Sequence, residues 1–546
     1  MDKNTKKNEK APLTPIHQFY HDALSDYPVS LRNTKTKGRH AVASRPLDEG
    51  TTVCLEQAAA FIVRSQYLDE HCHVCLDTLT AKKLMCSDCQ KSFYCSSTCL
   101  EKDTTHTIVC SAFSQVDAIG RATDVEADML RLIALLLARR QRDNENNRNR
   151  DQCSKEDEDK EKKKNNPTPY WCVEDLVSHR ERSDPNFIKV MTEAGHRLVS
   201  ELPESAKVPA EEVATLACRI NSNAHGLGDN DCRNTDVALG LFPLGAMFFN
   251  HACNPNCVFV GMKGGQLAFR TIRPVQQDEE LTVSYIDLYA TRDERRQDLL
   301  YTKHFWCRCK RCSAPMKASV DRYLQSIVCE DCCNDVYVIP PSPMDKVIQG
   351  EPNEVSAPEQ EQWTCASCGH SASAKHVAES IRKAKELYQE GIAAIQQERN
   401  YKRAKTKLEP LVKVDTSKKQ ALAGALHPQN AVRLNATIPL MNLLRRSQDI
   451  KGAIDMNRLI LECLEEHAKL SLPKNTPEIS DFYQNLGELC DLMAEKCRLS
   501  GRAPLERKWQ KEAKDAFANA AKVRSVVYGA DHPKTKHAKK YIAHRR

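Results

Sequence analysis

The chain has 546 residues, enough for roughly three or four folded domains. Its hydrophobic content of 41% supports packed cores, while 28% charged residues and a mean hydropathy of -0.57 exclude a mainly membrane-embedded protein. Lys and Arg number 80 against 73 Asp and Glu, so a net charge of +7 gives little reason to expect nucleic-acid binding.

The start of the chain lacks the apolar segment of a secretory signal, and the longest apolar run, near residues 237–249, is too short to span a bilayer. We therefore expect a protein of the reducing nucleus or cytoplasm, without choosing between these compartments. In either place, 25 cysteines are better explained as metal ligands than as disulfides.

The first elements along the chain alternate with charged segments. Residues 1–12 and 139–169 are rich in charge, and we expect both to be disordered, the second as a loop within a domain or as a linker. Between Gly38 and Leu55, short apolar stretches around Asp48-Glu49-Gly50 predict a hairpin. A leucine-rich helix is expected over 125–139, opened by a Thr123-x-x-Glu126 capping box.

Later in the chain, residues 258–272 predict a second hairpin that turns at Lys263-Gly264-Gly265. Leu281, Val283 and Tyr285 alternate as in a strand. From about Val377 onward, helical patterns separated by short breaks predict an array of helical hairpins.

The densest cysteine cluster lies between residues 72 and 110, where seven cysteines and one histidine provide ligands for two tetrahedral zinc ions. The alternating spacing of the pairs predicts two interleaved sites. So short a segment has little core of its own, so bound zinc would supply much of its folding free energy. Unrelated buried thiols are the alternative, and the regular spacing argues against it. One site would use Cys72, Cys75, Cys95 and Cys99, and the other Cys86, Cys89, His106 and Cys110.

Two further groups of cysteines have metal-ligand spacing. Cys307, Cys309 and Cys312 lack a fourth ligand, for which Cys253 is the candidate. The other group has the form of a zinc ribbon, with Cys333 as a competing ligand and incidental pairing as the alternative. Its two CxxC pairs are Cys329 with Cys332 and Cys365 with Cys368.

The segments Asn-His-Ala-Cys-Asn-Pro-Asn at 250–256 and Asp-Glu-Glu-Leu-Thr-Val-Ser-Tyr-Ile-Asp at 278–287, followed by the cysteines at 307–312, resemble the C-terminal half of a SET domain and its post-SET cysteines. The ligand string at 72–110 resembles a MYND finger, and Lys37-Gly38-Arg39 the N-terminal SET segment. The chain thus resembles the SET-and-MYND (SMYD) family of protein-lysine methyltransferases. Within that family it resembles a divergent, insect-type member.

This resemblance implies an α+β multidomain fold: a SET β-fold with an inserted MYND zinc finger, a post-SET zinc site and a C-terminal α-helical TPR-like array. The implied division is a disordered N-terminus at 1–12, N-terminal SET at 13–71, MYND at 72–110, a helical SET insert at 111–245 with its disordered loop at 139–169, C-terminal SET at 246–300, post-SET at 301–315, a zinc-ribbon-like segment at 316–375 and the TPR-like domain at 376–546.

The resemblance also implies an S-adenosylmethionine-dependent protein-lysine N-methyltransferase that acts on a histone or another protein. Tyr285 would be the catalytic tyrosine, orienting a neutral lysine amine toward the methyl group. The implied cofactor-binding residues are Lys37, Gly38, Arg39, Asn223, Asn250, His251 and Phe305. Four Zn²⁺ ions are expected, two in the MYND finger, one in the post-SET site and one in the ribbon-like segment.

The implied partners are a protein substrate with a target lysine, proline-containing peptides at the MYND finger, and chromatin co-regulators. Neither a membrane partner nor direct nucleic-acid binding is expected.

Three positions depart from the family pattern. His40 replaces the second glycine of a Gly-x-Gly near the cofactor, and His225 replaces an aromatic wall of the lysine channel. Lys303, four residues before Cys307, replaces a tyrosine. Pointing inward, it would place a competing amine or a like charge near the sulfonium. Pointing outward, it would leave a gap in the channel wall that Tyr301 fills only if the backbone shifts. These changes leave a second reading open, a degenerate SET scaffold that binds peptides and regulates transcription without methyl transfer.

Overall fold

The computed structural model describes residues 14–150, 167–228, 236–340, 362–414 and 422–543. The chain forms two compact units: Met1–His251 with Asn256–Val283, and Ala252–Pro255 with Ser284–Arg546. The disorder predicted for residues 1–12 lies outside the described residues. None of the described helices combines the length and apolar character that crossing a bilayer requires.

The first unit contains short strands and a set of helices. Its strands are β1 (Val29–Thr34), β2 (Gly38–Ala43), β3 (Thr52–Gln57), β4 (Ala60–Val63), β5 (Leu84–Met85), β6 (Phe93–Tyr94), β7 (Ala224–Leu227), β8 (Ala238–Leu241), β9 (Asn250–His251), β10 (Cys257–Met262), β11 (Gln266–Thr271) and β12 (Thr282–Val283). Its helices are α1 (Gln18–Ala23), α2 (Ser97–Lys102), α3 (Thr104–Thr123), α4 (Ala127–Arg150), α6 (Tyr170–Glu174), α7 (Pro185–Ser200), α8 (Ala210–Asn223) and α9 (Pro243–Phe248).

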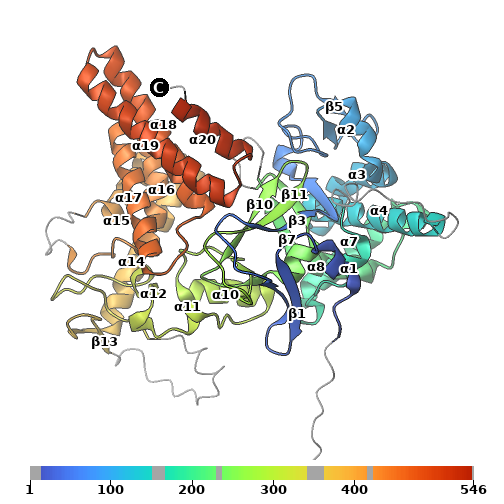
Figure 1. The fold of residues 1–546 in the computed structure, drawn as a ribbon, viewed down its shortest axis with the longest axis horizontal. Coiled ribbons are helices and arrows are strands. Elements are labelled where there is room, and N and C mark those ends of the chain that lie inside the picture. Colours follow the sequence, from blue (N-terminus) through green and yellow to red (C-terminus); the bar gives the residue numbers. More distant parts are fainter. Residues whose placement is uncertain (1–13, 151–166, 229–235, 341–361, 415–421, 544–546) are drawn as a thin grey trace, which may run out of the picture. The chain divides into compact units, whose positions relative to one another are not determined.

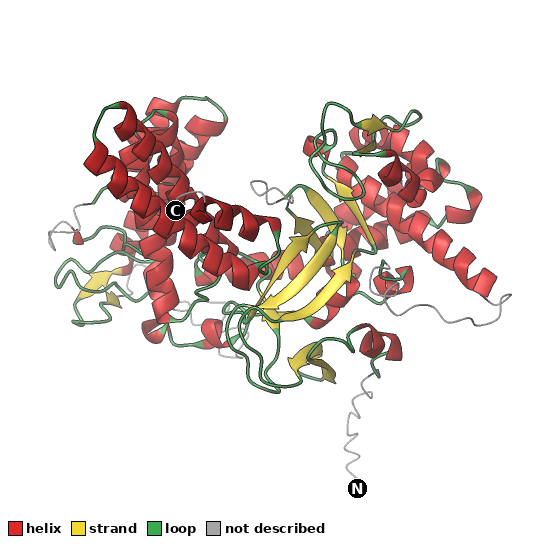
Figure 2. Cartoon of the chain, turned by 45° about the horizontal axis from the view of Figure 1, so that its top comes forward, coloured by secondary structure: helices red, strands yellow, loops and turns green. Residues whose placement is uncertain are grey.

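The strands of the first unit form several small sheets, drawn in yellow in Figure 2. Two sheets have three strands, in the orders β10-β11-β3 and β4-β8-β7, and all their pairings are antiparallel. The predicted hairpin at 258–272 is confirmed: β10 pairs with β11 across a turn at 263–265. The strand predicted at 281–285 is shorter, since β12 covers only Thr282–Val283.

The predicted hairpin between Gly38 and Leu55 is wrong, because its two halves pair with different strands. β2 pairs with β1, which lies just before it in the chain, whereas β3 pairs with β11. Gly38 makes the β1–β2 turn possible, since its φ of +66° is a conformation that glycine adopts without steric cost. The nearer partner, β1, was not identified from the sequence.

The helix boundaries around residue 125 also differ from the prediction. Thr123 is the last residue of α3, and its hydroxyl donates to the Ile119 carbonyl instead of capping the following helix. α4 begins at Ala127 and continues to Arg150, so disorder at 139–150 is wrong. Arg139 pairs with Asp143 one turn on, an interaction that supports a helix made of charged residues. Residues 151–166 lie outside the described residues.

The second unit begins with short elements and continues as helices. The early elements are α10 (Arg292–Lys303), α11 (Lys310–Ser313), α12 (Asp321–Leu324), β13 (Gln362–Thr364) and β14 (Ser371–Ser373). The helices that follow are α14 (Ala374–Gln396), α15 (Tyr401–Val412), α16 (Ala431–Arg446), α17 (Ile450–Leu470), α18 (Pro477–Leu499), α19 (Ala503–Val527) and α20 (Pro533–Ala543).

Consecutive helices from α14 to α20 pack against one another as hairpins, drawn in orange and red in Figure 1. The breaks are set by N-caps: Asn430, Asp449 and Thr476 accept backbone N–H groups at the starts of α16, α17 and α18. The predicted array of helical hairpins after residue 377 is therefore present. Its apolar residues form the packed faces, with Ile454, Ile460 and Phe517 fully buried.

Candidate active site and metal centres

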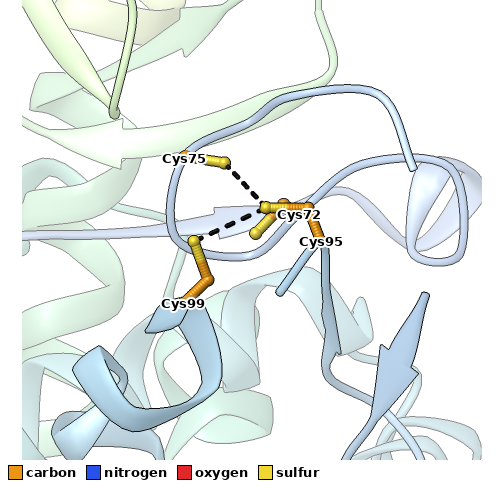
Figure 3. A group of neighbouring side chains, drawn as sticks. All are labelled: Cys72, Cys75, Cys95 and Cys99. Atoms are coloured by element: carbon orange, nitrogen blue, oxygen red, sulfur yellow. Dashed lines mark hydrogen bonds between the residues drawn. The ribbon is translucent and has the colours of Figure 1, made fainter. Parts of the chain in front are cut away.

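The first metal-ligand group of the MYND segment contains Cys72, Cys75, Cys95 and Cys99. Cys95 Sγ lies 3.6 Å from Cys75 Sγ and 3.6 Å from Cys99 Sγ, and all four sulfur atoms lie within 4.8 Å of one another. Figure 3 shows the four side chains converging, with Cys99 projecting from a helix. Four thiols converging on one point form the donor set of a structural zinc site.

The second group contains Cys86, Cys89, His106 and Cys110, the interleaved set expected from the spacing. His106 Nε2 lies 3.4 Å from Cys86 Sγ and 3.5 Å from Cys89 Sγ. The other ring nitrogen, Nδ1, lies 3.3 Å from Ser92 Oγ, so the buried imidazole presents Nε2 to the thiols. Ser92 was not singled out from the sequence as a supporting residue.

The third group joins Cys253 to the post-SET cysteines. Cys253 Sγ lies 3.5 Å from Cys312 Sγ and 3.9 Å from Cys307 Sγ, and Cys309 completes the group. Three of these four cysteines are buried. The structure therefore brings the expected distant ligand to the three clustered cysteines.

The fourth group is the ribbon-like set Cys329, Cys332, Cys365 and Cys368. Cys329 Sγ lies 3.8 Å from Cys368 Sγ, and Cys332 Sγ lies 3.7 Å from Cys365 Sγ. Cys333 does not belong to this group, so the predicted competitor is not among the converging thiols. His370 lies at its edge, with Nδ1 4.0 Å from Cys329 Sγ and 3.1 Å from Tyr337 Oη.

Buried arginines, which were not predicted from the sequence, surround the post-SET thiols. Asp321 holds three of them: its oxygens lie 2.9 Å from Arg292 Nε, 3.0 Å from Arg295 Nη2 and 2.8 Å from Arg311 Nη2. Burial acts to raise the pKa of Asp321, but Arg311 and the other two arginines outweigh it and hold this pKa at about 2. The only sequence signal was the Arg-Asp-Glu-Arg-Arg run at 292–296, which is common on solvated helices.

These arginines also contact the thiol group itself. Arg295 Nη2 donates to Cys312 Sγ at 3.7 Å, and Arg311 Nη1 donates to the Cys253 carbonyl at 2.9 Å. Positive charge beside four thiolates offsets their combined negative charge when a divalent ion is bound. The cage therefore fits a zinc–thiolate centre.

In the first unit, three chain segments meet at Asn250. Its side-chain nitrogen, Nδ2, donates to the Lys37 carbonyl at 3.2 Å, the Arg39 carbonyl at 3.5 Å and Glu280 Oε1 at 3.1 Å. Lys37 Nζ pairs with the same Glu280 carboxylate at 2.6 Å. The predicted residues Lys37, Gly38, Arg39 and Asn250 therefore lie together.

The segment 278–283 passes between strands that are far apart in the sequence. β12 pairs in parallel with β9, matching Thr282 to Asn250 and Val283 to His251. On its other side the segment pairs with β2, since the Leu281 amide donates to the Ala41 carbonyl at 2.9 Å. The crossing therefore fixes Asn250 and His251 beside the Lys37–Arg39 turn.

Asn256 fastens this crossing and was not assigned a role from the sequence. Its side chain, 1% exposed, donates to the Glu280 carbonyl at 2.8 Å and accepts from the Thr282 amide at 2.8 Å. Because a buried amide left without these partners costs free energy, Asn256 specifies the position of β12. The repeated asparagines of the 250–256 motif were the available signal.

A buried carboxylate positions the helix that leads into Asn250. Glu56 on β3 accepts from the amides of Leu244 and Gly245, at 3.0 and 2.9 Å, at the start of α9. It also accepts from the Thr168 hydroxyl at 2.7 Å. Burial raises the pKa of Glu56 to about 7, against the lowering effect of these three donors.

The other cofactor candidates of the first unit have defined partners. Arg39 Nη1 pairs with Asp175 at 2.6 Å, and Asn223 Nδ2 donates to the Val177 carbonyl at 2.9 Å. Arg39 and Asn223 are therefore both fastened to the segment 175–177. The structure thus brings the Asn223 helix end and the Lys37–Arg39 turn to one common segment.

The two histidines that depart from the family pattern are both buried. The His40 ring turns back to the Gly38 carbonyl, with Nδ1 2.9 Å from that oxygen. His225 lies among aromatic rings, 4.9 Å from Phe259 and 5.9 Å from Phe242 between ring centroids. His225, a residue of β7, therefore packs in the aromatic core.

Tyr285 belongs to the second unit, where its ring packs against the buried cluster of Cys253, Leu299, Cys307 and Cys312. Lys303 ends α10, and its Nζ lies 5.7 Å from the Tyr285 ring centroid. The inward alternative for Lys303 is therefore the one observed. Tyr301 is 85% exposed, so it does not substitute for the tyrosine that Lys303 replaces. Phe305 lies at the surface and is 36% exposed.

Comparison with known proteins gives matches to SET and to SET-and-MYND proteins. The family model for the SET domain matches residues 38–286. The chain is 26% identical over 291 residues to histone-lysine N-methyltransferase ASHR1 of Arabidopsis thaliana, and 25% identical over 305 residues to histone-lysine N-methyltransferase SMYD1 of Homo sapiens. A SET and MYND domain-containing protein of Dictyostelium discoideum is 24% identical over 380 residues. The chain is therefore similar to SET and SET-and-MYND proteins over about half of its length.

These alignments cover different shares of the SET-and-MYND relatives. The match spans 53% of this chain and 56% of both the Arabidopsis and the human protein, or about half the length of each. For the Dictyostelium protein it spans 63% of this chain and 95% of the relative. The SET match at 38–286 contains Gly38, Arg39, Asn250 and Glu280, and it ends one residue after Tyr285.

Proposed function

We propose that the chain is an S-adenosylmethionine-dependent protein-lysine N-methyltransferase that acts on a histone or another protein. The observation that carries this proposal is the crossing at Asn250, where a single amide joins the Lys37–Arg39 turn to Glu280. The SET match over residues 38–286 supports the assignment, as does similarity to two histone-lysine N-methyltransferases, ASHR1 of Arabidopsis thaliana and SMYD1 of Homo sapiens.

The residues near this crossing suit a cofactor with an amino-acid portion and a sulfonium. The turn leaves open space beside its backbone, since a Cβ added at Gly38 would meet no atom within 4 Å. Bound there, S-adenosylmethionine would supply an electrophilic methyl group. The residues proposed to hold it are Lys37, Gly38, Arg39, Asn223, Asn250, His251 and Phe305.

Tyr285 is proposed to orient the substrate amine. Its ring is fixed by packing against the post-SET cluster, so its hydroxyl has a defined direction. A fixed hydroxyl aligns an attacking amine by position and by its dipole, without forming a covalent intermediate. The post-SET zinc site would therefore support catalysis by holding Tyr285 in place.

The zinc and partner assignments complete the proposal. Zn²⁺ is proposed in all four thiol-rich groups, two in the MYND finger, one at the post-SET cysteines and one in the ribbon-like segment. The MYND finger is proposed to bind proline-containing peptides, with chromatin co-regulators as partners. Residence in the nucleus, the cytoplasm or both is proposed on the same resemblance.

Two measurements on the zinc-loaded protein test this function. Calorimetric titration with S-adenosylmethionine should give saturable binding, weakened in Asn250→Ala. Incubation with methyl-labelled cofactor and nuclear extract should label a protein substrate, and Tyr285→Phe should reduce that labelling about 100-fold or more. Tyr301→Phe, which alters an exposed tyrosine nearby, is the matched control and should leave labelling unchanged. Absence of cofactor binding would leave only a peptide-binding scaffold.

A further inference from the structure

The amine of Lys303 occupies an unusual position for a lysine at a helix end. It is the last residue of α10, where lysine side chains ordinarily extend into solvent. Here the side chain is only partly exposed, and Nζ lies 5.7 Å from the centroid of the Tyr285 ring. An ammonium over an aromatic face is held there by the electrostatic attraction of the ring.

The ring beneath this amine cannot easily move away. Tyr285 packs against Cys253, Leu299, Cys307 and Cys312, all of which are buried. With zinc bound, those thiols would be fixed by metal–sulfur bonds as well. Lys303 and Tyr285 therefore stay neighbours through small fluctuations of either side chain.

Burial also changes the chemistry of the amine. Desolvation lowers the pKa of Lys303, because removal from water disfavours the charged ammonium. A larger share of Lys303 is then the neutral amine, which is the nucleophilic form. By contrast, Lys310 in the neighbouring helix α11 is an exposed side chain.

We propose that Lys303 is itself a methyl acceptor, so that the protein methylates its own chain beside Tyr285. This inference depends on the proposed function, in which Tyr285 orients the amine that receives the methyl group. The structure places an internal amine next to that tyrosine, where the proposed reaction needs an amine from a substrate.

The transfer balances without any further reactant. The Lys303 nitrogen donates its lone pair to the methyl carbon, forming the N–C bond as the C–S bond breaks. The sulfur keeps that electron pair and becomes the neutral thioether of S-adenosylhomocysteine. The methylated nitrogen carries the positive charge until a proton leaves to water.

The first experiment measures the modification directly on the full chain. Zinc-loaded protein is incubated with methyl-labelled S-adenosylmethionine alone, digested and mapped by mass spectrometry. We expect label on the Lys303 peptide, at a rate independent of protein concentration because the reaction is intramolecular. Lys303→Arg should lose this label, whereas the matched control Lys310→Arg should keep it. Circular dichroism of each variant checks that it is folded.

A second readout reports position rather than turnover. A ¹³C-methyl group placed on the Lys303 amine by reductive methylation should give an NMR signal displaced upfield by the Tyr285 ring. Tyr285→Leu should remove that displacement. The random-coil chemical shift in the wild-type protein would contradict the geometry on which the inference rests.

The outcomes separate this inference from the proposed function. If a supplied protein substrate is methylated while Lys303 stays unmodified, the enzyme stands and the inference is overturned. Labelling of Lys303 that increases with protein concentration would also overturn it, since one molecule would then be modifying another. If neither cofactor binding nor any labelling is detected, the proposed function fails, and the inference fails with it.

Discussion

Asp321 is a single carboxylate that fixes three arginine side chains beside the post-SET thiols. Its side chain is fully buried, and so is that of Arg295. Replacement by Asn would leave Arg292, Arg295 and Arg311 buried without their counter-charge, a change that typically costs about 3–5 kcal/mol. We therefore expect Asp321→Asn to lower the free energy of unfolding by about that amount, measured by urea denaturation of the zinc-loaded protein.

The matched control for this prediction is Asp455→Asn, which removes an exposed carboxylate that pairs with Lys451 and Arg458 on α17. Exposed ion pairs contribute at most about 1 kcal/mol, so this variant should unfold close to the wild type. Equal losses in the two variants would show that the arginine cage does not depend on Asp321.

At the scale of residues, motif spacing predicted which side chains meet wherever a metal must be ligated. The distant partner Cys253 could be named because three clustered thiols lack a fourth ligand. The supporting residues Asn256, Glu56 and Asp321 could not, because buried polar side chains have no fixed spacing along the chain. Their partners come from other elements, and only the folded structure shows that each is buried and satisfied.

At the scale of elements, His467 makes the packing of α17 sensitive to pH. Its ring is fully buried, lies 5.6 Å from the Tyr289 ring and has Nε2 3.1 Å from the Gln429 carbonyl oxygen. Burial lowers the pKa of His467 from 6.5 to about 4. The unfolded chain then binds the proton more tightly, so this contribution to stability is complete above pH 6.5 and is lost as the pH falls toward 4.

A shift of this size corresponds to about 3 kcal/mol of the free energy of unfolding. The difference in unfolding free energy between wild type and His467→Gln should therefore shrink by about that amount as the pH falls from 6.5 to 4. Both proteins contain the same zinc ligands, so the difference between their unfolding free energies isolates the effect of His467. The control variant is His376→Gln, which alters an exposed histidine of the same chain. A pH-independent difference for His467→Gln would contradict the prediction.

The elements themselves were predictable where the nearest partner in sequence is also the partner in space. That condition holds for β10 and β11 and for the helical hairpins after Val377. It fails for β3, whose apolar pattern indicates a strand but cannot indicate that its partner is β11. The helix α4 was missed for a different reason. Its second half has the charged sequence typical of disorder, yet the Arg139–Asp143 ion pair one turn apart supports a helix there.

At the scale of the whole molecule, the number of bound zinc ions is the property that ties the assignments together. The described residues contain four groups of converging ligands, two in the first unit and two in the second. We therefore expect metal analysis of the purified chain to approach four zinc ions, because each group alone forms a complete tetrahedral donor set. Two or fewer ions per chain would contradict these ligand assignments.

The ribbon-like segment allows the sharpest version of this test, because a converging thiol and a non-converging one are adjacent in sequence. Cys332 belongs to the group with Cys329, Cys365 and Cys368, whereas Cys333 does not. Cys332→Ser should therefore lower the zinc content by one ion and reduce the thermal stability of the second unit, since structural zinc contributes directly to folding. Cys333→Ser should keep the full zinc content and the wild-type melting temperature. Loss of an ion from Cys333→Ser instead would mean that the neighbouring thiol is the true ligand, and would reassign the site by one residue.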